Sequence, residues 1–283
     1  MAETATANND QVAYWNATAG ETWAALQDRL DRQIEPLGAA VIEALAPKAG
    51  ERVADIGCGC GQTTIALAER VGTAGSVLGV DVSRPMLAVA RRRLTEQGLS
   101  QASLIEADAQ THPFEPQTLD AVFSRFGVMF FADPTAAFAN ILKGMKRSGR
   151  LGFLCWRAFS KNPWMGVPMA AALPHLTEAP PPPDPLAPGP FAFADRDRLH
   201  AILARAGFSD ISIVAQDKKI GSPTLDQAVE IALRVGPLGR FLNDRPDSAA
   251  AVVGAIREAL AAHLTPDGVR LGSATWVVGA RRR

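Results

Sequence analysis

The sequence has few of the residues that mark several common classes of protein. It contains three cysteines in 283 residues, and its 29 basic residues balance its 29 acidic residues. Three cysteines cannot build a disulfide framework, and they lack the paired CxxC spacing of a zinc site, so we expect small buried apolar residues and no metal. Nucleic-acid binding needs clustered Lys and Arg, and the sequence shows no basic stripe. We therefore expect no nucleic-acid partner.

Long apolar runs are also missing. The longest uncharged stretch, near residues 163–174, is too short and too rich in proline to span a bilayer, so we expect no membrane span. The first ten residues have neither a basic region nor an apolar stretch, which argues against a signal peptide and makes the cytoplasm the default location. With 47% hydrophobic residues, the chain can bury a substantial core.

The most informative segment is the glycine loop at residues 55–61, Asp-Ile-Gly-Cys-Gly-Cys-Gly. A strand precedes it at 52–54, and 62–70 has the apolar face of a helix. Alternate glycines let a backbone turn tightly and approach a ligand, and the free N–H groups of a helix start point at that ligand. A dinucleotide fingerprint needs G-x-G-x-x-G, and this chain has Gln62 at the third glycine position. The spacing therefore disfavours a nicotinamide site.

The second expected strand ends in a carboxylate. Residues 76–81 form an apolar run that ends in Asp81. An acid at this place in a doubly wound fold accepts hydrogen bonds from ribose hydroxyls, and its two oxygens suit a vicinal diol. The alternative is that Asp81 caps the next helix, but Ser83 is at least as good a cap. We therefore assign Asp81 to a ligand.

Two further strands also end in polar residues. The strand at 102–106 is followed by Asp108 and Ala109, and the strand at 119–124 ends in Ser124. An acid beside a strand is often only a loop residue. Polar residues at successive strand ends are more specific, because parallel strands present their carboxyl ends at one edge of the sheet.

An acid that opens a G-x-G-x-G loop, with acids after the next two strands, resembles the class I methyltransferases that use S-adenosylmethionine (SAM). The sequence looks closest to the ubiquinone/menaquinone-type enzymes of that family, which act on small molecules, and the resemblance runs from about residue 12 to 157. It implies an α/β, Rossmann-like, seven-stranded mixed sheet with helices on both faces. The sixth and seventh strands, at 211–214 and 274–278, would form an antiparallel hairpin, with N-terminal helices and an inserted helical cap or lid.

The resemblance also implies a role for each motif residue. Asp108 would accept from the exocyclic amine of adenine, and the N–H of Ala109 would donate to a ring nitrogen. Met86 would pack against adenine, or else is a core methionine of its own helix. Ser124 would lie where the methyl group meets its acceptor. The expected cofactor-binding residues are Asp55, Gly57, Gly59, Gly61, Asp81, Met86, Asp108, Ala109, Ser124, Tyr14 and Trp15.

We divide the chain into four parts. These are an N-terminal helical segment over the cofactor site (1–45), a SAM-binding core (46–158), a Pro-rich insertion or lid with a helix (159–208), and the final strands with an inserted helical cap (209–283, cap 223–266). Tyr14 and Trp15 of the first part would touch the methionine end of the cofactor or simply pack.

The insertion carries a proline run within residues 179–190, which holds the backbone in extended conformations. A proline-rich ligand for an SH3-type domain is an alternative reading of this run. We expect instead a surface loop that places an aromatic, Met-containing segment over the acceptor pocket. The candidate substrate-binding residues are Phe126, Phe130, Trp156, Trp164 and Met165.

These expectations combine into one function. The protein would move a methyl group from SAM to a small, largely apolar acceptor, mainly by positioning, and release S-adenosylhomocysteine (SAH). His112 and His175 are candidate general bases, although each is otherwise an ordinary loop histidine. A SAM-binding regulatory or interaction module without catalysis is the first alternative, and an NAD(P)-dependent oxidoreductase is the second. No sequence feature selects an oligomeric state.

Overall fold

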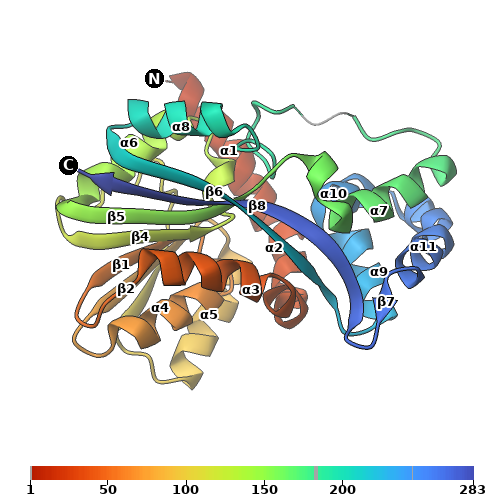
Figure 1. Ribbon diagram of the computed structural model, residues 1–283, viewed down its shortest axis with the longest axis horizontal. Coiled ribbons are helices and arrows are strands. Elements are labelled where there is room, and N and C mark those ends of the chain that lie inside the picture. The colour runs from red at the N-terminus through yellow and green to blue at the C-terminus, as the bar shows by residue number, and fades with distance from the viewer. Residues whose placement is uncertain (1, 182–183, 244) are drawn as a thin grey trace.

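A single mixed sheet forms the centre of the protein (Figure 1). The structure, a computed structural model, describes residues 2–181, 184–243 and 245–283. The strands are β1 (Arg52–Ile56), β2 (Ser76–Asp81), β3 (Ala102–Glu106), β4 (Leu119–Arg125), β5 (Met145–Trp156), β6 (Phe208–Ser222), β7 (Leu264–Thr265) and β8 (Gly268–Arg282). Their order is β3-β2-β1-β4-β5-β8-β6, and β7 pairs with β8 outside this path. Strands β1 to β5 are parallel, and β8 is antiparallel to both β5 and β6.

Helices cover both faces of the sheet, so the α/β, Rossmann-like fold predicted from the sequence is confirmed. Figure 1 places α3, α4 and α5 on one face and α6 and α8 on the other. The helices are α1 (Ala2–Asn16), α2 (Thr18–Ala25), α3 (Gln27–Leu45), α4 (Gln62–Val71), α5 (Arg84–Glu96), α6 (Pro134–Gly144), α7 (Pro163–Ala172), α8 (Arg196–Arg205), α9 (Leu225–Arg234), α10 (Gly236–Leu242) and α11 (Pro246–Ala261). Short 3-10 turns lie at η1 (Val128–Phe130), η2 (Phe159–Lys161) and η3 (Leu173–His175).

The chain reverses direction across the sheet between β1 and β4. It runs outward from β1 to β3 and then returns to place β4 on the other side of β1. In open α/β sheets such a switch point leaves a crevice at the carboxyl ends of the strands, where ligands bind. The segments that follow β1 and β4 are therefore expected to line the ligand crevice.

The hairpin of β6 and β8 is longer than the sequence predicts. The two strands pair from Phe208 opposite Arg282 to Ser222 opposite Val269. Strand β5 pairs with β8 only as far as Trp156 opposite Thr275, so the rest of the hairpin extends past the carboxyl end of β5 as an arm. The arm carries Asp-Lys-Lys at 217–219, which resembles a loop in sequence because all three residues are exposed on an edge strand.

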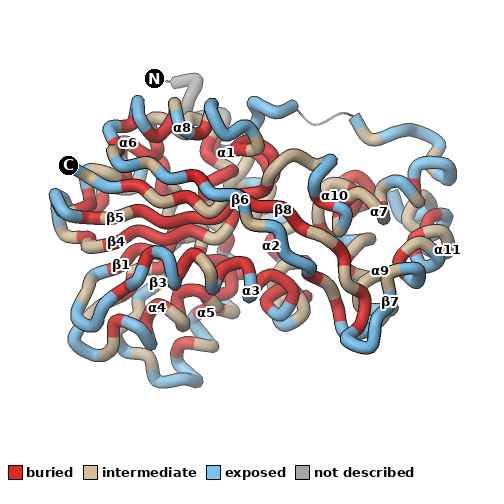
Figure 2. The backbone as a smooth tube through the Cα atoms, in the orientation of Figure 1, coloured by how far each residue is buried: buried red, intermediate tan, exposed pale blue. Residues whose placement is uncertain are grey.

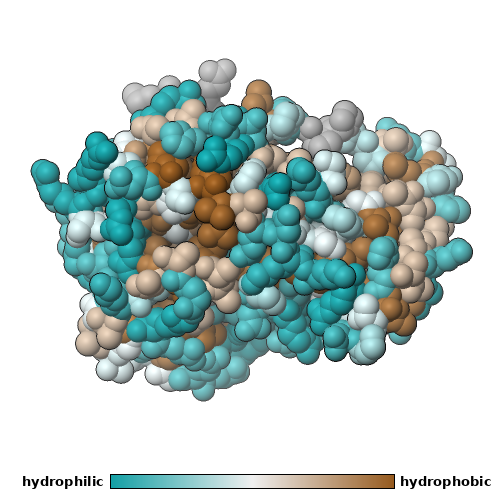
Figure 3. Space-filling view, viewed as in Figure 1, coloured by the Kyte–Doolittle hydropathy of each residue, from teal (hydrophilic) through white to brown (hydrophobic). Residues whose placement is uncertain are grey.

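Helices α7 and α9 pack against this arm, and α10 and α11 pack on α7 and α9; together the four helices form the cap (Figure 1). The cap has a hydrophobic cluster of its own, which includes Val252, Ile256 and Leu271, separate from the main core. Figure 2 shows nearly continuous burial along β4 and β5 and much more exposure around α11. On the same face, Figure 3 shows apolar residues reaching the surface in two regions, one over the sheet and one over the cap.

Two local expectations are wrong. The lid segment was expected to be a surface loop, but it begins with helix α7, whose Pro163 occupies the first turn and needs no N–H partner there. Burial of Met165 and Ala172 outweighs the poor helix propensity of this segment. The sequence also favours a turn at Ser148-Gly149, but these residues lie inside β5, where the pairing with β4 shifts. Residues 182 and 183 of the proline run lie outside the described residues.

Candidate cofactor and acceptor site

The glycine loop folds back over the end of β2. Gly57, Gly59 and Gly61 have φ angles of +69°, +54° and +83°, which favour glycine because a side chain is strained in this region. The N–H groups of Gly57 and Cys58 both donate to the carbonyl oxygen of Val80, at 2.8 and 3.2 Å. The loop is thus fixed between β1 and the start of α4.

The protein itself approaches these glycines closely. A Cβ atom on Gly57 would lie 2.6 Å from the Cα of Gly127, in the loop after β4. A Cβ atom on Gly59 would lie 2.8 Å from the terminal methyl carbon of Met86. The sequence interpretation invoked only the approach of a ligand, and the structure adds close packing of the two loops at the switch point.

Asp81 connects the end of β2 to the glycine loop. Its Oδ2 accepts from the N–H of Gly59, and its Oδ1 accepts from the N–H of Ser83, each at 2.8 Å. Burial raises its pKa. Each oxygen retains a second lone pair, so the carboxylate can still accept from a diol. Ser83 is the N-cap residue of α5, as expected, but its hydroxyl makes no capping bond and donates instead to the carbonyl oxygen of Trp15, at 2.7 Å.

Asp55 is a buried carboxylate at the mouth of the loop. Its Oδ2 accepts from the hydroxyls of Thr63 and Thr64, both at 2.7 Å. Its Oδ1 has no partner among the described residues. Burial raises the pKa of Asp55 to about 6, although the two threonines and the charge of Arg125 lower it. An unpaired acceptor on a buried acid suits a cationic donor, such as the ammonium group of SAM, so the residues present fit this cofactor.

Helix α1 contacts Asp108 and the residue that follows Asp81; Asp108 and Asp81 are the two acids that the sequence assigns to the nucleoside. The Asn8 amide of α1 donates to Oδ2 of Asp108, whose Oδ1 accepts from the N–H of Gln110 at 2.9 Å. At the other end of α1, the Asn16 amide donates to the carbonyl oxygen of Val82, one residue after Asp81, at 2.7 Å. Sequence reasoning missed Asn8 and Asn16, because neither lies in a recognisable motif.

The aromatic residues of the first helix face different neighbours. Trp15 meets Phe130 edge-on, with ring centroids 5.1 Å apart, beside the loop that follows β4. Tyr14 lies under the guanidinium group of Arg240 of the cap, at 4.7 Å. Burial raises the pKa of Tyr14, and the nearby Arg240 lowers it. Helix α1 is therefore in contact with the core, the cap and the candidate cofactor site.

Ser124 joins β1 to β4 across the switch point. Its hydroxyl donates to the carbonyl oxygen of Ile56 at 2.7 Å and accepts from the N–H of Gly127 at 3.2 Å. The side chain is fully buried and already used by the chain. A direct contact between Ser124 and a cofactor therefore stays a prediction.

An aromatic row leads from this point toward the cap. Phe126 stacks on Trp156 with centroids 4.1 Å apart and an interplanar angle of 10°. Trp156 in turn lies 5.2 Å from Trp164, at 45°. Trp164 and Met165 belong to α7 and line a cavity between the arm, α3 and the cap. Because the arm extends past the carboxyl end of β5, this cavity lies on the same side of the sheet as the glycine loop.

The cavity is mainly apolar. Gln33 and Ser222 are the polar residues of its lining, and no charged side chain is among the described residues that form it. The indole N–H of Trp164 is buried and has no partner within the described part of the chain. A buried N–H of this kind suits a hydrogen-bond acceptor, and the free volume of the cavity, about 30 Å³, is that of a single water molecule.

The two candidate bases lie apart from these groups. His112 packs edge-on against Phe114, with centroids 4.9 Å apart, and His175 is exposed in η3. Among the described side chains, neither makes a hydrogen bond or aromatic contact to the glycine loop or the cavity lining. Their catalytic roles stay predictions. No three His, Cys, Asp or Glu side chains in the described ranges could share a metal ion.

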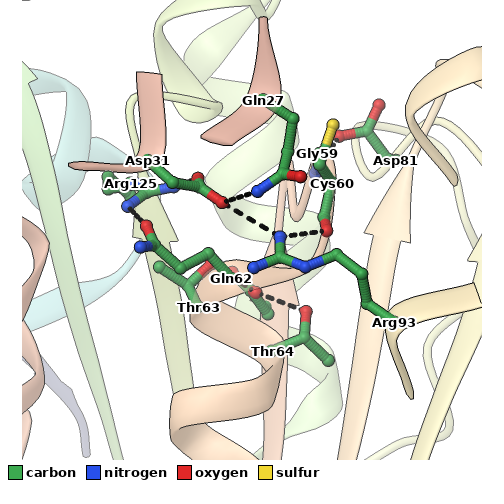
Figure 4. A network of polar contacts seen from close by, with 11 residues as sticks. Gln27, Asp31, Gly59, Cys60, Gln62, Thr63, Thr64, Asp81, Arg93 and Arg125 are labelled. Carbon is green, nitrogen blue, oxygen red and sulfur yellow. Dashed lines mark hydrogen bonds and ion pairs between the residues drawn. The ribbon is translucent and has the colours of Figure 1, made fainter. Parts of the chain in front are cut away.

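A buried charged network beside the loop was also missed. Asp31 of α3 accepts from Arg93 of α5 at 2.9 Å and from Arg125 of β4 at 3.3 Å (Figure 4). Arg125 also donates to the side chain of Gln62, the residue that replaces the third glycine of a dinucleotide fingerprint. Asp31, Arg93 and Arg125 lie in three separate segments of the sequence, so no local sequence pattern predicts that they meet.

The sheet order and the loop at its switch point define the class I methyltransferase fold, and the comparisons with known proteins agree. Residues 53–149 match a family model described as a methyltransferase domain. This chain is 37% identical over 118 positions to aklanonic acid methyltransferase of Streptomyces sp. (strain C5). The aligned segment covers 42% of this chain and 54% of that enzyme. Nocamycin O-methyltransferase of Saccharothrix syringae is 25% identical, over 81% of this chain and 84% of its own.

A further relative and a solved structure are also methyltransferases. Demethylmenaquinone methyltransferase of Lactobacillus johnsonii is 35% identical, over 39% of this chain and 46% of that enzyme. The chain thus spans about half the length of two of these three relatives. Among solved structures, Haemonchus contortus phosphoethanolamine N-methyltransferase 2 in complex with SAM aligns with a TM-score of 0.55 and 19% identity, over 88% of this chain and 53% of that one.

Proposed function

We propose that the protein transfers the methyl group of SAM to a small, neutral, largely apolar organic molecule. The observation that carries the proposal is the set of polar groups at one edge of the sheet. Asp55 presents an unpaired buried oxygen, Asp81 joins the glycine loop to the end of β2, and Asp108 follows β3. The match of this region to a methyltransferase domain supports the same reading.

SAM carries its methyl group on a sulfonium, which is its own leaving group, so the protein need only bind, orient and exclude water. In this proposal Asp55 would pair with the ammonium group, Asp81 would accept from the ribose hydroxyls, and Asp108 with the N–H of Ala109 would recognise adenine. Asn8 would have to share or release Asp108 for this last contact. Phe126 and Trp156 would then lie between the cofactor and the acceptor.

The acceptor class follows from the cap cavity. Its lining is apolar apart from Gln33 and Ser222, and the buried N–H of Trp164 lacks a partner among the described residues. These features favour a neutral molecule that carries an oxygen acceptor. The names of the relatives refer to aklanonic acid, nocamycin and demethylmenaquinone, which supports a small-molecule acceptor.

Our four-part division of the chain and its cytoplasmic location belong to the same proposal. No helix of the described chain could cross a membrane.

A ligand panel tests the cofactor, and a release assay tests the reaction. Thermal unfolding of the purified protein with SAM, SAH, NAD and NADP should show stabilisation by SAM and SAH alone, since only a ligand of the folded state raises the midpoint. An SAH-release assay over libraries of neutral phenols, quinones and amines should then find turnover. Stabilisation by SAH without turnover on any library would favour a binding module, and stabilisation by NAD would favour an oxidoreductase.

A further inference from the structure

The Asp31 network connects three elements that are far apart in sequence. Asp31 lies on α3, Arg93 on α5 and Arg125 at the end of β4 (Figure 4). Only 11% of the Asp31 side chain is exposed, with 19% for Arg93 and 11% for Arg125. The amide of Gln27, one turn earlier on α3, donates to Oδ2 of Asp31 at 2.5 Å and fixes the carboxylate.

Both arginines also reach the exit of the glycine loop. Nη1 of Arg93 donates to the carbonyl oxygen of Cys60 at 2.8 Å, and Arg125 donates to Oε1 of Gln62. Cys60 and Gln62 flank Gly61, the residue with a φ of +83° at which the loop enters α4. Asp31 is therefore linked through two arginines to the residues on both sides of Gly61.

The local sequence of α3 makes room for this arrangement. A Cβ atom on Gly38 would lie 2.9 Å from Cδ of Arg125, so only glycine lets the arginine stem lie this close to the helix. The stem crosses α3 on its way to Asp31 and Gln62. The helix therefore supplies both the carboxylate and the space that the second arginine needs.

Stability alone is a poor explanation for this network. Removing charges from water costs free energy that their mutual attraction barely offsets, so a buried ion network is weak evidence of stabilisation. What such a network does supply is a fixed geometry. A loop rich in glycine loses much backbone freedom when it closes on a ligand, and a loop held in place beforehand loses less.

We propose that Asp31 is a positioning residue that presets the glycine loop for the cofactor through Arg93 and Arg125. The inference rests on the proposed function only for the identity of the ligand, SAM or SAH. The claim that Asp31 holds the glycine loop in one conformation does not depend on that function. The proposal predicts that replacing Asp31 weakens cofactor binding by more than the accompanying loss of folding stability would explain. Binding of the acceptor should not change.

The protein contains a matched control at the opposite edge of the sheet. Glu51, just before β1, pairs with Arg150 at 2.7 Å, and each side chain is 17% exposed. Arg150 also donates to the carbonyl oxygens of Leu45 and Ala46, at 2.6 and 2.7 Å. This pair repeats the chemistry and burial of the Asp31 network far from the glycine loop. Glu51→Gln therefore reports the stability effect alone.

The experiment compares Asp31→Asn, Arg93→Met and Glu51→Gln with the wild type. Arg93→Met keeps an apolar stem, cuts the bond to Cys60, and leaves Asp31 with one guanidinium, so it decides the question if Asp31→Asn does not fold. Calorimetry should show SAH affinity about tenfold weaker in both network variants and unchanged in Glu51→Gln. Amide hydrogen exchange at residues 57–62, without ligand, should be faster only in the network variants. With an acceptor in hand, KM for SAM should rise while kcat holds.

Each outcome decides between the two claims. If the wild type does not bind SAH, the proposed function fails, and the hydrogen exchange of the loop still tests the positioning. If the wild type binds SAH and both network variants bind it equally well with unchanged exchange at 57–62, the positioning role is overturned. An equal loss of SAH affinity in Glu51→Gln would also overturn it, because the effect would then follow stability.

Discussion

At the carboxyl ends of β1 to β4, most buried polar side chains are hydrogen-bonded to backbone groups of neighbouring loops, whereas a buried indole N–H of the cap has no described partner. Asp81 and Ser124 illustrate the first region, and Trp164 the second. The contrast matches what each region would bind. A cofactor of constant structure calls for polar groups held in fixed positions, while a largely apolar acceptor is selected by shape and by few polar contacts.

The largest effect should come from the contact that joins the two loops of the cofactor region. Gly57→Val places a branched side chain at a φ of +69°, with its Cβ 2.6 Å from the backbone of Gly127. We expect a loss of roughly 3 kcal/mol or more of folding free energy, measured by urea unfolding. Gly59→Ala shares the strain of a positive φ, +54°, but its Cβ meets only the flexible end of Met86, so it should lose less. Equal losses would mean that the contact with Gly127 is unimportant.

The next effect concerns the acid that connects the loop to β2. Asp81→Ala leaves the N–H groups of Gly59 and Ser83 without their acceptor and removes the proposed ribose contact. SAH affinity, measured by calorimetry, should fall by about 1–3 kcal/mol, while acceptor binding in the cap should change little. Wild-type SAH affinity in this variant would remove Asp81 from the site.

Protonation of Asp55 should make SAH affinity depend on pH. Burial raises its pKa from 3.8 to about 6, so folding favours the neutral acid, and its contribution to stability is full below about pH 4 and declines as pH rises to about 6. The ionised form is the one that would pair with an ammonium group. SAH affinity should therefore increase about tenfold from pH 5 to pH 7. A pH titration of Asp55→Asn should be flat, and an equal pH dependence in that variant would assign the effect to another group.

The smallest effect should distinguish two tryptophans. Trp164→Phe keeps an aromatic wall but removes the unpaired N–H. The KM for an oxygen-bearing acceptor should therefore rise about fivefold, which corresponds to about 1 kcal/mol, while SAH affinity stays unchanged. Trp276→Phe is the control, because its N–H donates to the carbonyl oxygen of Ala194 at 3.0 Å. The control should lose stability and keep its acceptor KM. A loss of SAH affinity in Trp164→Phe would place Trp164 beside the cofactor instead.

The two regions also differ in how far the sequence predicts them. The glycine loop, Asp81 and Asp108 each follow a strand directly, so local patterns place them at one edge of a parallel sheet. The Asp31 network and the bond between Asn8 and Asp108 join residues some 60 to 100 positions apart, and no local pattern encodes them. Helix α7 and the outer arm form because they bury apolar residues in the hydrophobic cluster of the cap, and that burial outweighs their own propensities.

The position of β8 between β5 and β6 has a consequence for the order of assembly during synthesis. Strand β6 leaves the ribosome well before β8, the neighbour it pairs with along its whole length, has been made. The sheet therefore cannot be completed until the segment that forms α9, α10 and α11 has also been translated. Entry of β8 between its neighbours would then close the main core and the arm of the cap in one step, which ties the maturation of the two proposed binding regions together.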